Sequence, residues 1–176
     1  YTPRDKHAYQ LDFPKLVHRY QAQKAREHGI RLRDRVLGSP DFLGALGRAS
    51  LGIANVMNKV RPHRVLMELA LGIHRDKLLP DFAATTFEKW ARRAGKLAEK
   101  PGAEAVLFQT CFVQNNAPEV GRDAVEVLEK NGVGIKCLEG LKCCGMPAWE
   151  HGDLETLQKN AHHNLEVLMP HVEAGS

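Results

Sequence analysis

The sequence predicts an α/β fold, in which a parallel, Rossmann-like β-α-β-α unit follows a region of several short helices. Two short apolar runs, at residues 105–108 and 133–138, are typical of buried strands. Each run is followed by a segment with helical spacing, first at residues 118–131 and then from Asp153 onward. Strands that alternate with helices favour a parallel sheet with right-handed crossovers.

The first hundred residues contain helical patterns and no clear strand pattern. Residues 1–11 are polar and irregular, which is typical of a linker. Asp12 is expected to cap a helix that ends near Gly29. That helix carries apolar side chains at helical spacing, namely Phe13, Leu16, Val17 and Tyr20.

Four further helices are expected before residue 100. They cover residues 31–37, residues 41–59, the segment from Pro62 to Leu71, and a segment that begins near Thr85. Thr85 and Glu88 have the spacing of a capping box for the last of these helices.

In the second part of the chain, both helices are expected to pack on the strands. The helix over residues 118–131 is expected to turn Val120, Ala124, Val127 and Leu128 inward and to stop at Gly132. Asp153 is the expected cap of the last helix.

Charge divides the chain into two parts. Residues 1–100 carry 20 Lys and Arg against 10 Asp and Glu, a net of +10, whereas residues 101–176 carry 5 against 11, a net of −6, and the two sum to the overall +4. We therefore predict a basic helical connecting region at 1–100 and a cysteine-bearing region at 101–176. With aromatic residues at only 6% and no recognised motif, nucleic acid is not an expected partner.

The four cysteines all lie in the acidic part, and two of them are adjacent. Cys143 and Cys144 are followed directly by Gly145, which permits a positive φ, and by Pro147, which biases Met146 toward extended geometry. This pattern predicts a rigid loop that presents two sulfurs. Cys111 follows the first apolar run, so it is expected at the same carboxyl edge of the sheet as the loop.

Thiolates at this spacing favour an iron–sulfur cluster held by Cys111, Cys143 and Cys144. Zinc prefers spaced pairs in a closed tetrahedron, whereas a cluster offers separate metal corners to neighbouring sulfurs. Zinc, a redox dithiol and structural thiols remain alternatives from spacing alone. Cys137 occupies a strand position, where burial as a structural thiol is favoured over a role as a ligand. His162 and His163 are expected to be solvated.

The same residues resemble a known family. Residues 108–111, 116–121 and 128–132, together with the Cys143-Cys144-Gly145 loop, are similar to the cysteine-rich CCG domain of iron–sulfur oxidoreductases. That family includes the C subunit of anaerobic glycerol-3-phosphate dehydrogenase, the iron–sulfur subunit of glycolate oxidase and the B subunit of heterodisulfide reductase. Residues 12–14, 72–75, 79–80 and 87–90 resemble the connecting region of the glycerol-3-phosphate dehydrogenase type.

This resemblance implies an electron-transfer subunit that relays electrons between a flavin-bearing dehydrogenase subunit and a quinone or disulfide-type acceptor. The cofactor implied is a [4Fe-4S]-type cluster with Cys111, Cys143 and Cys144 among its ligands. No general acid, base or nucleophile stands out, so any activity would belong to the cluster or to a partner. The competing hypothesis is a metal-free thiol–disulfide module that uses the same three cysteines.

The resemblance also implies a longer protein. In the family a Cys-x-x-Cys follows the cysteine pair and a ferredoxin-like module comes first, so residues 101–176 are expected to be the first half of a CCG domain, and this piece alone is expected to lack some cluster ligands. Charges interrupt every apolar run, and no signal peptide is recognised. The expected location is cytoplasmic, with peripheral contact at the cytoplasmic face of the membrane as a further expectation.

Overall fold

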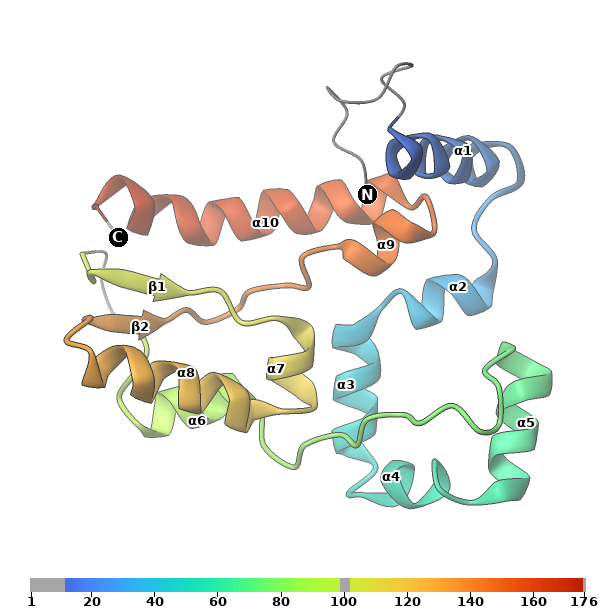
Figure 1. Cartoon of the computed structure of the whole chain (residues 1–176), viewed down its shortest axis with the longest axis horizontal. Coiled ribbons are helices and arrows are strands. Elements are labelled where there is room, and N and C mark those ends of the chain that lie inside the picture. The colour runs from blue at the N-terminus through green and yellow to red at the C-terminus, as the bar shows by residue number, and fades with distance from the viewer. Residues whose placement is uncertain (1–11, 99–101, 176) are drawn as a thin grey trace.

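The computed structural model describes residues 12–98 and 102–175 (Figure 1). The expected linker at residues 1–11 lies outside the described residues, and so do residues 100 and 101 at the expected boundary. Ten helices and two strands are found in the described residues. In chain order they are α1 (Phe13–His28), α2 (Leu32–Leu37), α3 (Pro40–Ala49), α4 (Ile53–Met57), α5 (Arg61–Leu71), α6 (Phe87–Arg93), β1 (Ala105–Leu107), α7 (Cys111–Asn115), α8 (Pro118–Lys130), β2 (Ile135–Cys137), α9 (Met146–Glu150) and α10 (Leu154–Glu173).

The two strands are parallel, as the alternating pattern predicts. Ala105 pairs with Ile135 and Leu107 with Cys137. In Figure 1, β1 and β2 run between α10 above and α8 and α6 below. Within the described residues the sheet has only these two strands, so the α/β character is present, and two strands alone do not establish a Rossmann-like unit.

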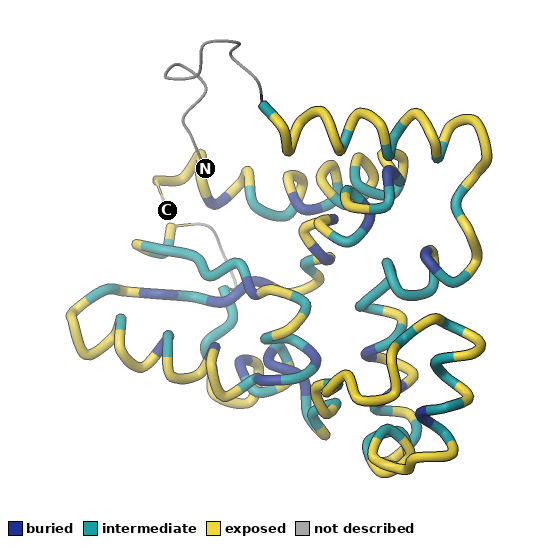
Figure 2. Tube along the Cα trace, turned by 45° about the vertical axis from the view of Figure 1, so that its right-hand side comes forward, coloured by how far each residue is buried: buried dark blue, intermediate teal, exposed yellow. Residues whose placement is uncertain are grey.

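The core lies where α6 and α8 meet β2. Phe87 and Ala91 of α6 are fully buried against Val125 of α8 and against Ile135 and Cys137 of β2. Burial of such side chains stabilises a fold by about 1.5–3 kcal/mol each for the larger ones. The buried segments of Figure 2 concentrate in this part of the molecule.

The inward face of α8 was predicted correctly at two of four positions, because Leu128 packs against the core and Ala124 is half-buried. Val120 and Val127 are exposed, whereas Gly121 and Val125 are buried. Gly121 lies so close to α6 that an added Cβ would come within 2.5 Å of the Phe87 ring. The absence of a side chain at Gly121 therefore sets the packed face, and an apolar pattern cannot reveal this.

The helix caps follow the expected chemistry with one shift. Asp12 accepts from the Lys15 N–H at 3.1 Å at the start of α1. Asp153 accepts from the Thr156 N–H at 3.1 Å at the start of α10. At the start of α6 the cap is Thr86 and not Thr85, because the Thr86 hydroxyl accepts from the Lys89 N–H.

One prediction for the helical region was wrong. The segment over residues 41–59 is interrupted where Leu51 and Gly52 adopt positive φ angles of 51° and 92°, which end one helix before the next begins. The apolar residues of α1 are exposed and not packed inward. Contact of α1 with the rest of the chain comes from its other side, where His18 lies 4.7 Å from the Trp149 ring of α9.

Candidate functional site

Cys111 lies just after β1, as predicted, and begins the short helix α7. The Thr110 side chain accepts from the Val113 N–H at 3.3 Å and so caps this helix. The Phe112 backbone N–H donates to the Cys111 sulfur. Helix α7 was not predicted from the sequence, and it fixes the direction in which Cys111 leaves the strand.

The cysteine pair lies in the loop between β2 and α9. Cys143 is 4% exposed, whereas Cys144 is exposed. Gly145 has a φ of 87°, and a Cβ there would lie 2.6 Å from the Leu157 side chain, so both conformation and space require glycine. The expectation that Met146 is extended was wrong, because Met146 begins α9 with Pro147 in its first turn.

The structure brings Cys111 and Cys143 together. Their side chains form a hydrogen bond, which lowers the pKa of Cys111 to about 7, while burial acts in the opposite direction. The same hydrogen bond, together with burial, raises the pKa of Cys143. The pair therefore readily loses one proton, and the remaining S–H stabilises the thiolate that forms.

Two further groups act on this pair. The charge of Cys144 is close enough to raise the pKa of Cys111, so Cys144 lies near the pair although it does not join the hydrogen bond. Asp41 of α3 is close enough to raise the pKa of both paired thiols. The Gly145 backbone N–H donates to the Cys143 sulfur and acts in the opposite direction.

Helix α10 holds the backbone of the cysteine loop through three polar side chains. Asn164 accepts from the Lys142 N–H at 2.8 Å and donates to the Lys142 carbonyl at 3.1 Å. Asn160 donates to the Cys143 carbonyl at 3.1 Å, and the Nε2 atom of His163 lies 2.8 Å from the Gly140 carbonyl oxygen. His163, which was expected to be solvated, is half-buried and makes this contact with the loop.

Helices of the basic region hold the same loop from other directions. Glu88 of α6 accepts from the Gly140 N–H at 3.1 Å, and Asp41 of α3 accepts from the Cys143 N–H at 3.0 Å. Sequence reasoning missed these carboxylates, and it also missed the amides of α10. The only signal was the spacing of Asn160, His163 and Asn164, which places them on one helix face.

Cys137 is separate from this group. It is 1% exposed within β2, its backbone N–H donates to the Lys96 carbonyl at 2.8 Å, and burial raises its pKa to about 11. No interaction among the described residues links it to Cys111 or Cys143. These surroundings fit the structural role predicted for Cys137.

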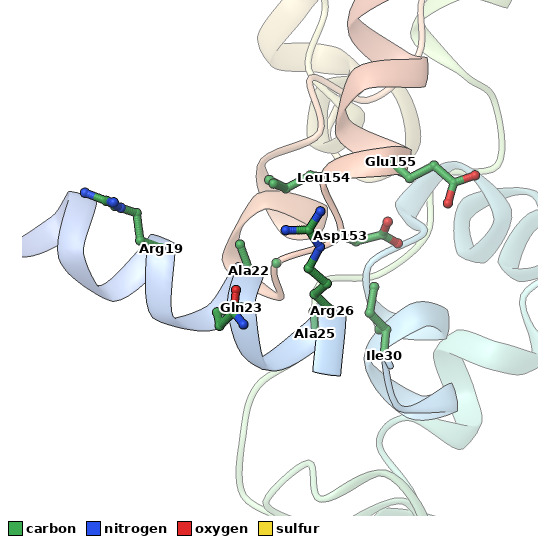
Figure 3. Close-up of a pocket in the computed structure, with 10 residues that line it drawn as sticks. Arg19, Ala22, Gln23, Ala25, Arg26, Ile30, Asp153, Leu154 and Glu155 are labelled. Carbon is green, nitrogen blue, oxygen red and sulfur yellow. The ribbon is translucent and has the colours of Figure 1, made fainter. Parts of the chain in front are cut away.

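A second candidate site is a depression of about 610 Å³ between α1 and the start of α10, and it contains no thiol (Figure 3). Arg26 reaches toward α10 in this view, while Arg19 and Glu155 extend away from it in opposite directions. The Asp153 carboxylate already accepts from the Thr156 N–H and hydroxyl. None of the lining residues is a cysteine, so the cysteines define the candidate site.

The donor set at the cysteines fits iron–sulfur ligation better than a single metal ion. In the part of the chain that the structure describes, no three Cys, His, Asp or Glu side chains converge as one ion would require. A cluster takes each thiolate at a different iron, so neighbouring cysteines suit it. Backbone N–H groups directed at two of the sulfurs are the kind of contact that tunes such clusters.

Comparison with known protein families gives one match. Residues 105–174 match the family described as "Cysteine-rich domain", abbreviated CCG. This range contains all four cysteines and both strands. No solved structure is significantly similar to the chain.

Two kinds of curated relative are similar to parts of the chain. Over 137 residues it is 32% identical to the C subunit of anaerobic glycerol-3-phosphate dehydrogenase of Escherichia coli, an overlap of 78% of this chain and 35% of that protein. Over 62 residues it is 45% identical to "Lactate utilization protein A" of Shouchella clausii, an overlap of 35% of this chain and 26% of that protein. The chain thus spans about a third of the length of the glycerol-3-phosphate dehydrogenase subunit and about a quarter of the length of the lactate utilization protein.

Within residues 12–98 and 102–175, no helix is both long enough and apolar enough to cross a bilayer.

Proposed function

Because residues 105–174 match the cysteine-rich CCG domain, as the sequence resemblance predicts, we propose that this chain is part of an iron–sulfur electron-transfer subunit of a dehydrogenase complex. The similarity to the C subunit of anaerobic glycerol-3-phosphate dehydrogenase supports a role beside a dehydrogenase partner. The partner proposed is a flavin-bearing subunit, and the acceptor is a quinone or a disulfide. The protein is proposed to work in the cytoplasm, at the membrane face where a quinone would be met.

The observation that carries this proposal is the contact between Cys111 and Cys143, with Cys144 beside it. These three thiols are the proposed protein ligands of a [4Fe-4S]-type cluster, with any further ligand supplied from outside this chain's four cysteines. Such a cluster supplies reversible one-electron transfer when it is bound. This chain contributes the thiolates, the N–H groups of Phe112 and Gly145 that face the sulfurs, and the burial of Cys143.

Cys111 and Cys143 differ in how readily they release the protons that metal ligation must displace. Metal ligation requires thiolates, so binding releases the thiol protons. The lowered pKa of Cys111, about 7, means that its first proton is lost readily. The second proton, on Cys143, is held more firmly because of the hydrogen bond and burial. A bound cation would be needed to displace it.

The test is to measure iron, acid-labile sulfide and the visible spectrum on anaerobically purified protein with its native flanking sequence. Iron with sulfide is expected, and Cys111→Ser, Cys143→Ser and Cys144→Ser should each lower it strongly. Cys137→Ser, on the same protein, is the matched control and should keep the cluster. Protein that contains neither iron nor sulfide when purified in this way would contradict the proposal.

A second candidate is a metal-free thiol–disulfide module, and the geometry favours one pair for it. Cys111 would attack a disulfide as the thiolate, and Cys143, in contact with it, would resolve the mixed disulfide. The products are the Cys111–Cys143 disulfide and the two thiols of the reduced substrate. The two cysteines thereby transfer two electrons to the substrate disulfide. Iron-free wild-type protein that reduces a small disulfide, with loss of that activity in Cys143→Ser, would support this candidate over the first.

A further inference from the structure

Helix α3 contacts both segments that carry the proposed ligands, although it lies in the basic helical region. Asp41, Gly44 and Arg48 follow one another at helical spacing of three and four, so they share one face of α3. That face meets the cysteine loop at one end and α7 along the rest. Figure 1 shows α3 and α7 side by side.

At the first end, Asp41 fixes the position of Cys143. The Cys143 N–H donates to the Asp41 carboxylate at 3.0 Å, and the Cys143 carbonyl accepts from Asn160 of α10 at 3.1 Å. Both backbone groups of this cysteine are therefore held by side chains, one from α3 and one from α10. A hydrogen bond to a carboxylate is among the stronger kinds in proteins.

Along its length, α3 fixes the helix that begins at Cys111. A Cβ at Gly44 would lie 2.4 Å from the Asn115 side chain, so α7 approaches α3 as closely as glycine allows. Asn115 is 3% exposed, and its side-chain oxygen accepts from Arg48. Asn115 stands four residues after Cys111, on the same face of α7.

We propose that α3 sets the separation of Cys111 and Cys143, and that Asp41 is the positioning residue through which it holds Cys143. The role of the thiols as cluster ligands rests on the proposed function, whereas the positioning acts on the thiols whether or not a metal is bound. Asp41 thereby makes the basic helical region part of the site, since it lies 102 positions from Cys143 in the sequence.

The first test uses iron-free, reduced protein and follows alkylation of each cysteine by iodoacetamide with mass spectrometry. In Asp41→Ala, the buried Cys143 is expected to react about 10 to 100 times faster, because the loop loses a hydrogen bond to a charged group. Asp41→Asn retains an acceptor oxygen and should lose less of the protection. The buried Cys137 serves as an internal reference, because it becomes reactive only if the core opens.

Glu119→Ala is the matched control variant. Glu119 follows the proline that opens α8, as Asp41 follows the proline that opens α3, and both are acidic residues of a first helical turn. Glu119 is exposed, and its side chain makes no hydrogen bond or ion pair among the described residues. Its removal should leave the alkylation of Cys143 unchanged.

The outcomes separate this inference from the proposed function. Equal acceleration at Cys143 and Cys137, or none at Cys143, would overturn the role of Asp41. Iron content of the complete protein is the second readout: if the wild type holds iron and Asp41→Ala holds as much, α3 does not position the ligand. If the wild type holds no iron and Cys143 alone is deprotected in Asp41→Ala, the positioning role stands and the cluster proposal falls.

Discussion

The four thiols of the chain differ in burial and in the groups around them, and a hydrogen bond links the side chains of Cys111 and Cys143. Cys111 has a lowered pKa, Cys143 and Cys137 have raised ones, and only Cys144 is exposed. Spacing in the sequence predicts that Cys111 comes near the loop, since both follow parallel strands. It does not predict which of the two adjacent cysteines turns inward, because that depends on the φ of 87° at Gly145.

Alkylation of Cys111 should follow pH with a midpoint near 7 in the iron-free protein. The thiolate is the reactive form, so the rate should rise tenfold per pH unit below the midpoint and level off above it. In Cys143→Ala the S–H donor is missing, and the midpoint should move upward. Quenched alkylation with mass spectrometry measures both profiles. A midpoint that does not move in Cys143→Ala would contradict the hydrogen bond as the cause.

Replacement of Cys137 by Ala should lower stability without affecting the site. The side chain is 1% exposed in the core, so its removal leaves a small cavity and should cost about 1 kcal/mol of unfolding free energy. Urea unfolding measures this change. Iron content in the complete protein should remain at the wild-type level, and a loss of iron would instead make Cys137 a ligand.

At the scale of the elements, patterns of residue type predict the strands and caps better than they predict the packed faces. The parallel pairing of residues 105–107 with 135–137 is confirmed. The inward face predicted for α8 is right at Ala124 and Leu128 and wrong at Val120 and Val127. The closest approach of α8 to α6 is made by Gly121, which carries no apolar side chain. The spacing of apolar residues predicts contacts made by apolar side chains. It cannot predict a close contact that forms because a residue, such as Gly121, has no side chain.

Gly121→Ala should therefore destabilise the protein although alanine favours helices. The new Cβ would meet Phe87 at 2.5 Å and Val113 at 2.7 Å, both in or against the core, and overpacking of this kind costs about 1–3 kcal/mol. Thermal unfolding followed by circular dichroism measures the difference. Gly134→Ala is the control, since its Cβ would meet only the flexible Glu104 side chain at 3.3 Å. Equal stability of the two variants would contradict tight packing at α8.

At the scale of the whole molecule, apolar burial is unevenly distributed. The buried hydrophobic residues of the described chain all lie at or after Phe87. The buried residues of α2, α3 and α5 are instead Asp34, two glycines and Arg64. Apolar side chains of α2 to α5 line a cavity of about 630 Å³ that they do not fill. The two parts that differ in net charge therefore also differ in how much apolar surface they bury. Helix α6 is an exception, because it belongs to the basic part and packs in the core of the second part.

Hydrogen exchange should reveal this unevenness. Amides in α2, α4 and α5 should exchange faster than those in α6, α8 and β2, because local opening exposes less buried apolar surface. Exchange followed by mass spectrometry of peptic fragments gives the comparison. Amides of α3 next to Asp41 and Gly44 should be the slowest of the basic region, since that face is held by Cys143 and Asn115. Uniform protection across the chain would contradict the prediction.

The long sequence separation in the site also has a consequence for synthesis. A ribosome adds about 5–20 residues per second, so Cys143 is made about 5–20 s after Asp41, with which it pairs. Cys111 is made in between, and Asn160 and Asn164 follow last. From its own synthesis until Cys143 is added 32 residues later, Cys111 exists without the partner that lowers its pKa. For the proposed cluster, the groups that hold the cysteine loop are therefore complete only after α10 has been translated.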